Sequence, residues 1–240
     1  MAKLNNRSLS SIVLSISLSV LSMGARSPAP EPPTGFHGPW LSGRTIVIDP
    51  GHGGRDPGSI GSRSREDKIN LELATQLAKW FHLAGASVVM TWSQPSEMPP
   101  HRRFNVRQRV AVINRSHADV LIDIHCNAGG PYWGPQTFYW SGDPSYTLAT
   151  MIQQELQFFT GTRRQVNRID QYVLRYANMP AVNVEAGFIS NASEEKKLMS
   201  PSYQRQLTWY IFIGTERWFL RARWPSAISR EPSHVEMLQR

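Results

Sequence analysis

From about residue 41 onward, short apolar runs alternate with longer segments in which apolar residues recur every three or four positions. Short apolar runs bounded by Gly, Pro, Asn or Asp are typical of buried strands, and the longer spacing is typical of helices that pack one face on a core. The runs predict strands over 45–48, 86–91, 120–125, 136–140, 172–175 and 181–185. The spaced segments predict helices over about 64–84, 104–116, 145–159 and 201–220.

The first predicted helix carries a start signal and a stop signal. Ser64 and Asp67 have the spacing of a capping box, and Gly85 follows the last apolar position. Strands that alternate with helices are typical of a sheet that is covered by helices on both faces. We therefore expect an α/β protein, a single-domain three-layer α/β/α sandwich with a mixed, mostly parallel sheet, formed by residues 41–220.

The two ends of the chain differ in composition from this central region. Lys3 and Arg7 precede a serine-containing apolar run over 11–23, and the small pair Gly24-Ala25 follows it, which is the layout of a secretory signal. We expect a signal peptide or short membrane anchor and an exported protein; a frayed amphipathic tail is the alternative. The expected segments are the signal or anchor over 1–25, a proline-rich linker over 26–40 and a flexible C-terminal tail over 221–240.

The charge balance narrows the class of partner. The chain of 240 residues has a formal net charge of +8 and a pI near 10.0. Such a chain favours anionic partners, which include nucleic acid, membrane surfaces and bacterial wall polymers. The basic residues are spread in pairs, without zinc-finger spacing or an RNA-binding signature, so we do not expect nucleic acid to be the partner. Cys126 is the single cysteine, which excludes an intramolecular disulfide.

Chemically active side chains gather where predicted strands end. His52 lies in a glycine-rich segment after the first strand, and His125 lies at the end of the third. In open α/β sheets, sites form at the carboxyl ends of strands. Zinc binds imidazole nitrogen and carboxylate oxygen where thiolates are absent, and a catalytic site keeps one position open. Two histidines therefore suggest a zinc site with a carboxylate as third ligand, and the candidates for it are Glu66, Asp49, Asp56 and Asp67.

Glu185 ends another apolar strand and admits two interpretations. It is either a strand-end carboxylate that faces water or a general base that takes a proton from an attacking water molecule. The second role needs a tuned pKa and hydrogen-bond reach to that water. The residue pattern alone leaves both interpretations open.

Four segments resemble the motifs of the zinc-dependent N-acetylmuramoyl-L-alanine amidases, the amidase 3 family. They are 45–61 (TIVIDPGHGGRDPGSIG), 66–71 (EDKINL), 118–128 (ADVLIDIHCNA) and 179–191 (MPAVNVEAGFISN), in the family's order. The resemblance spans about residues 41–219 and implies a zinc exopeptidase-like fold. It also implies Zn²⁺ held by His52, Glu66 and His125, with Glu185 as the catalytic residue. The implied reaction is hydrolysis of the amide between N-acetylmuramic acid and L-alanine in peptidoglycan.

Some positions depart from the family's pattern or extend it. Asp123 stands where the family usually has a small residue, often serine. Because residues two apart in a strand share a face, Asp123 either supports the metal ligand His125 or forms an ion pair with an arginine, and we favour the ion pair. We interpret Cys126 as a small buried thiol. Arg175 and Asn127 are further candidates for contact with the substrate.

Within the family, segments 107–114 and 133–139 resemble the germination-specific, spore-cortex (CwlD) type. The segment between Asn127 and Glu185 is too short for the regulatory helix that Gram-negative cell-division amidases carry there, so we expect control by a partner protein or by timed expression. The resemblance implies a role in muramic lactam formation, in the cell wall or the forespore intermembrane space, with membrane contact only through the N-terminal segment. The alternatives are a general autolysin, a zinc peptidase and a wall-binding module without turnover.

Overall fold

The computed structural model describes residues 40–94 and 105–223. The predicted segments 1–25 and 26–40 lie outside the described residues apart from Trp40, and so does the predicted tail beyond Arg223. No helix within the described ranges combines the length and the apolar character that crossing a membrane requires.

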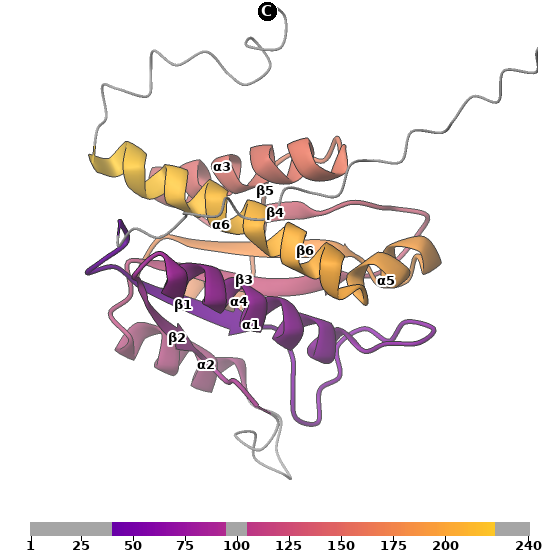
Figure 1. Cartoon of the computed structure of the whole chain (residues 1–240). Coiled ribbons are helices and arrows are strands. Elements are labelled where there is room, and N and C mark those ends of the chain that lie inside the picture. Colours follow the sequence, from indigo (N-terminus) through magenta and orange to yellow (C-terminus); the bar gives the residue numbers. More distant parts are fainter. Residues whose placement is uncertain (1–39, 95–104, 224–240) are drawn as a thin grey trace, which may run out of the picture. The chain divides into compact units, whose positions relative to one another are not determined.

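The centre of the molecule is a six-stranded mixed sheet (Figure 1). Its strands lie in the order β2-β1-β3-β6-β4-β5. The strands are β1 (Thr45–Pro50), β2 (Ser87–Met90), β3 (Val120–Asn127), β4 (Gln136–Tyr139), β5 (Asn167–Arg168) and β6 (Ala181–Phe188). Strands β2, β1, β3 and β6 are parallel, whereas β4 is antiparallel to β6. The expected mixed, mostly parallel sheet is confirmed.

Helices cover both faces of the sheet. They are α1 (Glu66–Leu83), α2 (Val106–Arg115), α3 (Asp143–Thr160), α4 (Tyr172–Tyr176), α5 (Ala192–Leu198) and α6 (Pro201–Arg223). Alternate residues of β1, such as Ile46 and Ile48, pack into the larger core with α1, α3 and α6, whereas Val47 packs on the opposite face with α2 and α4. This alternation is the side-chain period of a strand that is buried on both faces. The three-layer sandwich is therefore confirmed (Figure 1).

The predicted strand over 172–175 is wrong, because the segment Tyr172–Tyr176 forms the short helix α4. Its consecutive residues Val173 and Leu174 are both buried, while Tyr172 and Tyr176 are exposed and their rings lie 4.5 Å apart. A ring pair at positions i and i+4 is helical geometry, since side chains four apart meet on one helix face. The aromatic and β-branched composition of this segment favoured a strand, but the burial of the adjacent residues Val173 and Leu174 is achieved in a helix.

Two elements were not predicted. Helix α5 follows Asn191, whose side chain accepts hydrogen bonds from the backbone N–H groups of Ser193 and Glu194. An asparagine followed three residues later by a glutamate is a helix-start signal, so the sequence contained the information for α5. Strand β5 has only two residues and offers no pattern to read.

The start of α1 also differs from the prediction. The residue before the helix is Arg65, and no side chain caps it. Ser64 donates its hydroxyl to Glu195 of α5 instead, at 2.8 Å. Ser64 therefore does not cap α1 but ties the preceding loop to α5, and α1 begins at Glu66.

Candidate active site

The loop that follows β1 presents His52. This residue has a φ of 64°, a left-handed backbone conformation that is strained for a residue with a Cβ. The backbone groups of Gly53 and Asp56 hydrogen-bond each other and close the turn behind it. Before the turn, a Cβ added to Gly51 would lie 2.3 Å from the imidazole of His125. Only glycine therefore allows the loop to lie directly against the end of β3.

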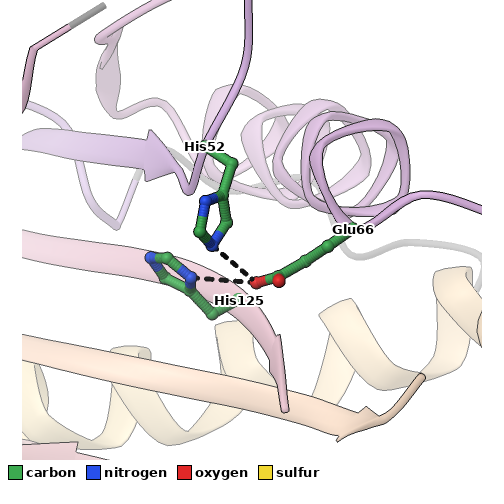
Figure 2. A group of neighbouring side chains, drawn as sticks. All are labelled: His52, Glu66 and His125. Atoms are coloured by element: carbon green, nitrogen blue, oxygen red, sulfur yellow. Dashed lines mark hydrogen bonds and ion pairs between the residues drawn. The ribbon is translucent and has the colours of Figure 1, made fainter. Parts of the chain in front are cut away.

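Three side chains from separate elements converge in front of this loop (Figure 2). The carboxylate oxygen Oε1 of Glu66 lies 3.2 Å from Nε2 of His52 and 3.0 Å from Nδ1 of His125. One donor atom from each of the three residues falls within 4.8 Å of the other two, a geometry that suits a metal ion. We call His52, Glu66 and His125 the metal group. One of its members comes from the loop after β1, one from the first turn of α1 and one from the end of β3.

The Glu66 carboxylate is held firmly in place. Its side chain is 3% exposed. The backbone N–H of Ser59 donates to Oε2 at 2.8 Å, and that of Cys126 donates to Oε1 at 3.1 Å. A Cβ on Gly58 would lie 2.6 Å from Oε2, so the loop closes over the carboxylate without room for a side chain. A ligand fixed by its surroundings binds without the entropy cost of ordering it.

The charges in the metal group favour a bound cation. Burial acts to raise the pKa of Glu66, but hydrogen bonds and charge from His125 and His52 lower it well below its usual range. Burial acts to lower the pKa of each histidine, yet neighbouring carboxylates hold both pKa values above normal. Two imidazoles around one buried carboxylate thus stabilise positive charge. Nitrogen and oxygen donors in this arrangement fit zinc, with three protein ligands and one open position.

The other carboxylates that the sequence left open have different roles. Asp49 accepts a hydrogen bond at 2.6 Å from the buried guanidinium of Arg109. Asp67 is paired with Arg65 at 2.7 Å. Asp56 lies 3.1 Å from Nδ1 of His52, on the ring nitrogen opposite to Glu66. Of the candidate carboxylates, the structure therefore brings Glu66 between the two histidines.

Glu185 lies on β6 in register with His125 on the neighbouring strand β3. Burial raises the pKa of Glu185 to about 7, and the charge of His125 opposes this rise. The amide of Asn183 donates to its Oε1 at 3.3 Å, whereas Oε2 has no hydrogen-bond partner among the described residues. A carboxylate with a pKa near neutrality and a buried, unpartnered oxygen can accept a proton at physiological pH.

The preferred interpretation of Asp123, an ion pair with an arginine, is wrong. Its Oδ1 lies 3.3 Å from Nε2 of His125, and its Oδ2 accepts a hydrogen bond from Gln171 at 3.0 Å. No residue type in the segment around Gln171 signalled this contact, because it depends on how the chain enters α4. Cys126 is 2% exposed, which confirms a buried cysteine.

The two candidate substrate contacts lie differently. Asn127 ends β3 two residues beyond His125, and its side chain accepts a hydrogen bond from the backbone of Ala128. Arg175 lies on α4, where its guanidinium stacks 4.9 Å from the ring centre of Trp140 and pairs with Asp170. Asn127 is therefore next to the metal group in the chain, whereas the contacts of Arg175 are with residues outside that group.

One supporting residue escaped the sequence analysis. Glu195 on α5 accepts hydrogen bonds from the hydroxyls of Ser62 and Ser64 and from the backbone of Arg63. Burial acts to raise the pKa of Glu195, but these hydrogen bonds lower it to about 2. The loop between His52 and Glu66 is thus anchored to a helix that follows β6.

Comparison with known proteins agrees with this geometry. Residues 46–217 match the model of the family Amidase_3, described as N-acetylmuramoyl-L-alanine amidase. The germination-specific N-acetylmuramoyl-L-alanine amidase of Bacillus subtilis is 34% identical over 197 residues, which cover 75% of this chain and 83% of that protein. The sporulation-specific N-acetylmuramoyl-L-alanine amidase of the same organism is 31% identical over 176 residues, covering 72% of this chain and 68% of that protein.

A solved structure is also similar. The amidase CwlD from Clostridioides difficile, in complex with the GerS lipoprotein, superposes with a TM-score of 0.69 at 31% identity. The match covers 74% of this chain and 98% of that one. The family model spans the sheet, the flanking helices and all four residues of the site. The chain therefore belongs to the Amidase_3 family of N-acetylmuramoyl-L-alanine amidases.

Proposed function

We propose that this chain uses zinc to hydrolyse the amide between the lactyl group of N-acetylmuramic acid and the L-alanine of the stem peptide. The observation that carries the proposal is the convergence of His52 and His125 on the Glu66 carboxylate, with Glu185 beside His125 on the adjacent strand. The net charge of +8 suits a polymer whose stem peptides carry carboxylates.

His52, Glu66 and His125 would hold the metal through Nε2, Oε1 and Nδ1, the atoms that face one another. When bound, zinc supplies Lewis acidity toward the amide carbonyl and lowers the pKa of water. Glu185 accepts a proton from the attacking water on its unpartnered Oε2 and returns it to the leaving amine of L-alanine. In the metal-free protein burial raises the pKa of this carboxyl group to about 7, and a cation held by His52, Glu66 and His125 would favour its ionised form, which is the base.

The test is mass spectrometry of purified peptidoglycan after digestion by the enzyme. The expected products are glycan strands with free lactyl groups and intact stem peptides that begin with L-alanine. Cleavage within the stem peptide, or turnover of free peptides at the same rate as glycan-linked ones, would favour the zinc-peptidase alternative. Binding without product release would favour a wall-binding module.

A single substitution tests the role of Glu185. Glu185→Gln keeps the size of the side chain and its contact with Asn183 but removes the base. We expect the variant to retain its metal while turnover falls about 10²–10⁴-fold, the usual contribution of general acid–base catalysis. Metal analysis of the purified variant is the control, and near-normal turnover at full metal content would place the base elsewhere.

We also propose that the enzyme acts outside the cytoplasm, on spore cortex, and that a partner protein regulates it. Support comes from the relatives named for germination and sporulation and from the structure of the CwlD amidase with the GerS lipoprotein. Deleting the gene should abolish muramic lactam in the cortex of the host's spores. Unchanged cortex, or a host that forms no spores, would leave the alternative of a general autolysin.

A further inference from the structure

Both imidazoles of the metal group have a carboxylate at the ring nitrogen that does not face Glu66. His52 presents Nε2 to Glu66, and its Nδ1 lies 3.1 Å from Oδ2 of Asp56. His125 presents the opposite nitrogen, Nδ1, to Glu66, and its Nε2 lies 3.3 Å from Oδ1 of Asp123. The two histidines therefore direct different nitrogens toward the metal position. The other ring nitrogen lies near Asp56 in His52 and near Asp123 in His125.

The acid behind His125 is the more deeply buried of the two. Asp123 is 0% exposed, and it lies on the same face of β3 as His125 because the two residues are two positions apart. Its Oδ2 is fixed by the amide of Gln171 at 3.0 Å. Its Oδ1 lies within ion-pair distance of Nε2 of His125, at 3.3 Å, and makes no hydrogen bond among the described residues.

Among the described residues, Asp123 forms its ion pair with His125. Its cross-strand neighbour on β1 is Asp49, and the buried guanidinium of Arg109 is hydrogen-bonded to Asp49 and to the carbonyl of Pro50. A fully buried carboxylate is costly unless it is paired. The contact with His125 offsets part of this cost, and a metal ion on the far side of the imidazole would add to the compensation.

We propose that Asp123 is a positioning residue that holds His125 with Nδ1 toward the metal and so strengthens metal binding. This inference rests on the proposed zinc-dependent function. A carboxylate at Nε2 stabilises the tautomer with hydrogen on Nε2, which leaves the lone pair of Nδ1 free for the metal. The same carboxylate orients the ring and increases its strength as a ligand.

The test measures metal affinity rather than turnover. Zn²⁺ dissociation constants of the full chain and of the variants Asp123→Ala and Asp123→Asn are determined by competition with a chromophoric chelator. We expect Asp123→Ala to bind Zn²⁺ about 10- to 100-fold more weakly. Asp123→Asn should weaken binding less, since its amide oxygen still accepts a hydrogen bond but lacks the charge. Absorption spectra with Co²⁺ should change in both variants because the ligand field of His125 changes.

Asp119→Asn is the matched control. Asp119 directly precedes the same strand, β3, at the end away from His125, and pairs with Arg44 at 2.8 Å. Its loss should leave the Zn²⁺ dissociation constant and the Co²⁺ spectrum unchanged. Thermal unfolding of every variant in chelator reports the fold separately.

The outcomes separate this inference from the function on which it rests. A wild-type chain that binds no Zn²⁺ would refute the metal-dependent function. A wild-type chain that binds Zn²⁺, with both Asp123 variants binding it equally tightly, would overturn the positioning role alone. If Asp123→Ala does not fold, the isosteric Asp123→Asn decides, because lower thermal stability with unchanged Zn²⁺ affinity would also overturn the positioning role.

Discussion

Glu185→Gln should stabilise the metal-free protein at alkaline pH and leave its stability unchanged at acidic pH. Burial raises the pKa of Glu185 from 4.5 to about 7, and its Oε2 lacks a hydrogen-bond partner among the described residues. The folded protein therefore disfavours the ionised carboxylate, which water solvates freely in the unfolded chain. Glutamine has the same shape, can still accept from Asn183 and carries no charge at any pH.

The sign and size of the effect follow from proton linkage. Below pH ~4.5 the carboxyl group is protonated in both states, so wild type and variant should be equally stable. As the pH rises toward 7, only the unfolded state releases the proton, and wild type loses stability relative to the variant. At ~1.4 kcal/mol per pH unit the deficit reaches about 3 kcal/mol above pH ~7. This is an upper limit, since Glu185 is half-buried and solvent screens part of the effect.

The assay is urea unfolding in the presence of a chelator, at several pH values from about 4 to 9. Glu72→Gln, at an exposed position on α1, controls for the loss of one carboxylate; it should follow wild type because its amide oxygen can still accept the hydrogen bond that Gln204 donates to Glu72 at 2.7 Å. Parallel curves for wild type and Glu185→Gln across this range would refute the argument that burial perturbs this carboxyl group. A variant that is less stable at high pH would show that the carboxylate is favourably paired in the folded protein.

Three further substitutions test other parts of the site. Gly51→Ala should abolish metal binding, because the new Cβ would lie 2.3 Å from the His125 ring; metal content checks this, and a normally loaded variant would contradict it. Glu195→Gln should lower the free energy of unfolding at neutral pH by about 1–3 kcal/mol, as measured in urea. The hydrogen bonds lower the pKa of Glu195 to about 2, so the stabilisation by its carboxylate is fully present above pH ~4.5 and is lost as the pH falls through about 2. If the variant and wild type unfold alike in acid, Glu195 does not stabilise the protein in this way. Arg109→Met should cost about 3–5 kcal/mol, since it strips Asp49 of its buried counter-charge; a calorimetric loss below ~1 kcal/mol would show that Asp49 is compensated elsewhere.

Most of the fold was predictable because the central strands β1, β3 and β6 are buried on both faces. Runs such as Ile46–Ile48 and Val120–Ile122 are continuous and apolar, and such runs have no solvated face to confuse the pattern. Prediction failed where the element was short. In α4, aromatic and β-branched residues with strand-like propensity form a helix because Val173 and Leu174 pack together on the second core.

The residues of the metal group were predictable from the sequence, but the contacts that hold these residues in place were not. His52, Glu66 and His125 are present in recognisable motifs, and the structure brings all of them together. The interpretation of Asp123 failed because a buried acid and many arginines made an ion pair the simpler expectation. Its actual partners, His125 and Gln171, depend on strand register and on the path of the chain before α4.

The sequence by itself determined the order of the longer elements, the family and the residue types of the site, because these depend on local periodicity and on motifs of contiguous residues. Only the tertiary structure decided which ring nitrogen each histidine presents to Glu66 and which carboxylate lies at the opposite nitrogen of each ring. Those properties arise from contacts between residues far apart in the chain, such as Glu66 with His125 and Ser62 with Glu195. Their geometry is set by sheet register and helix packing, which no local pattern of side chains specifies.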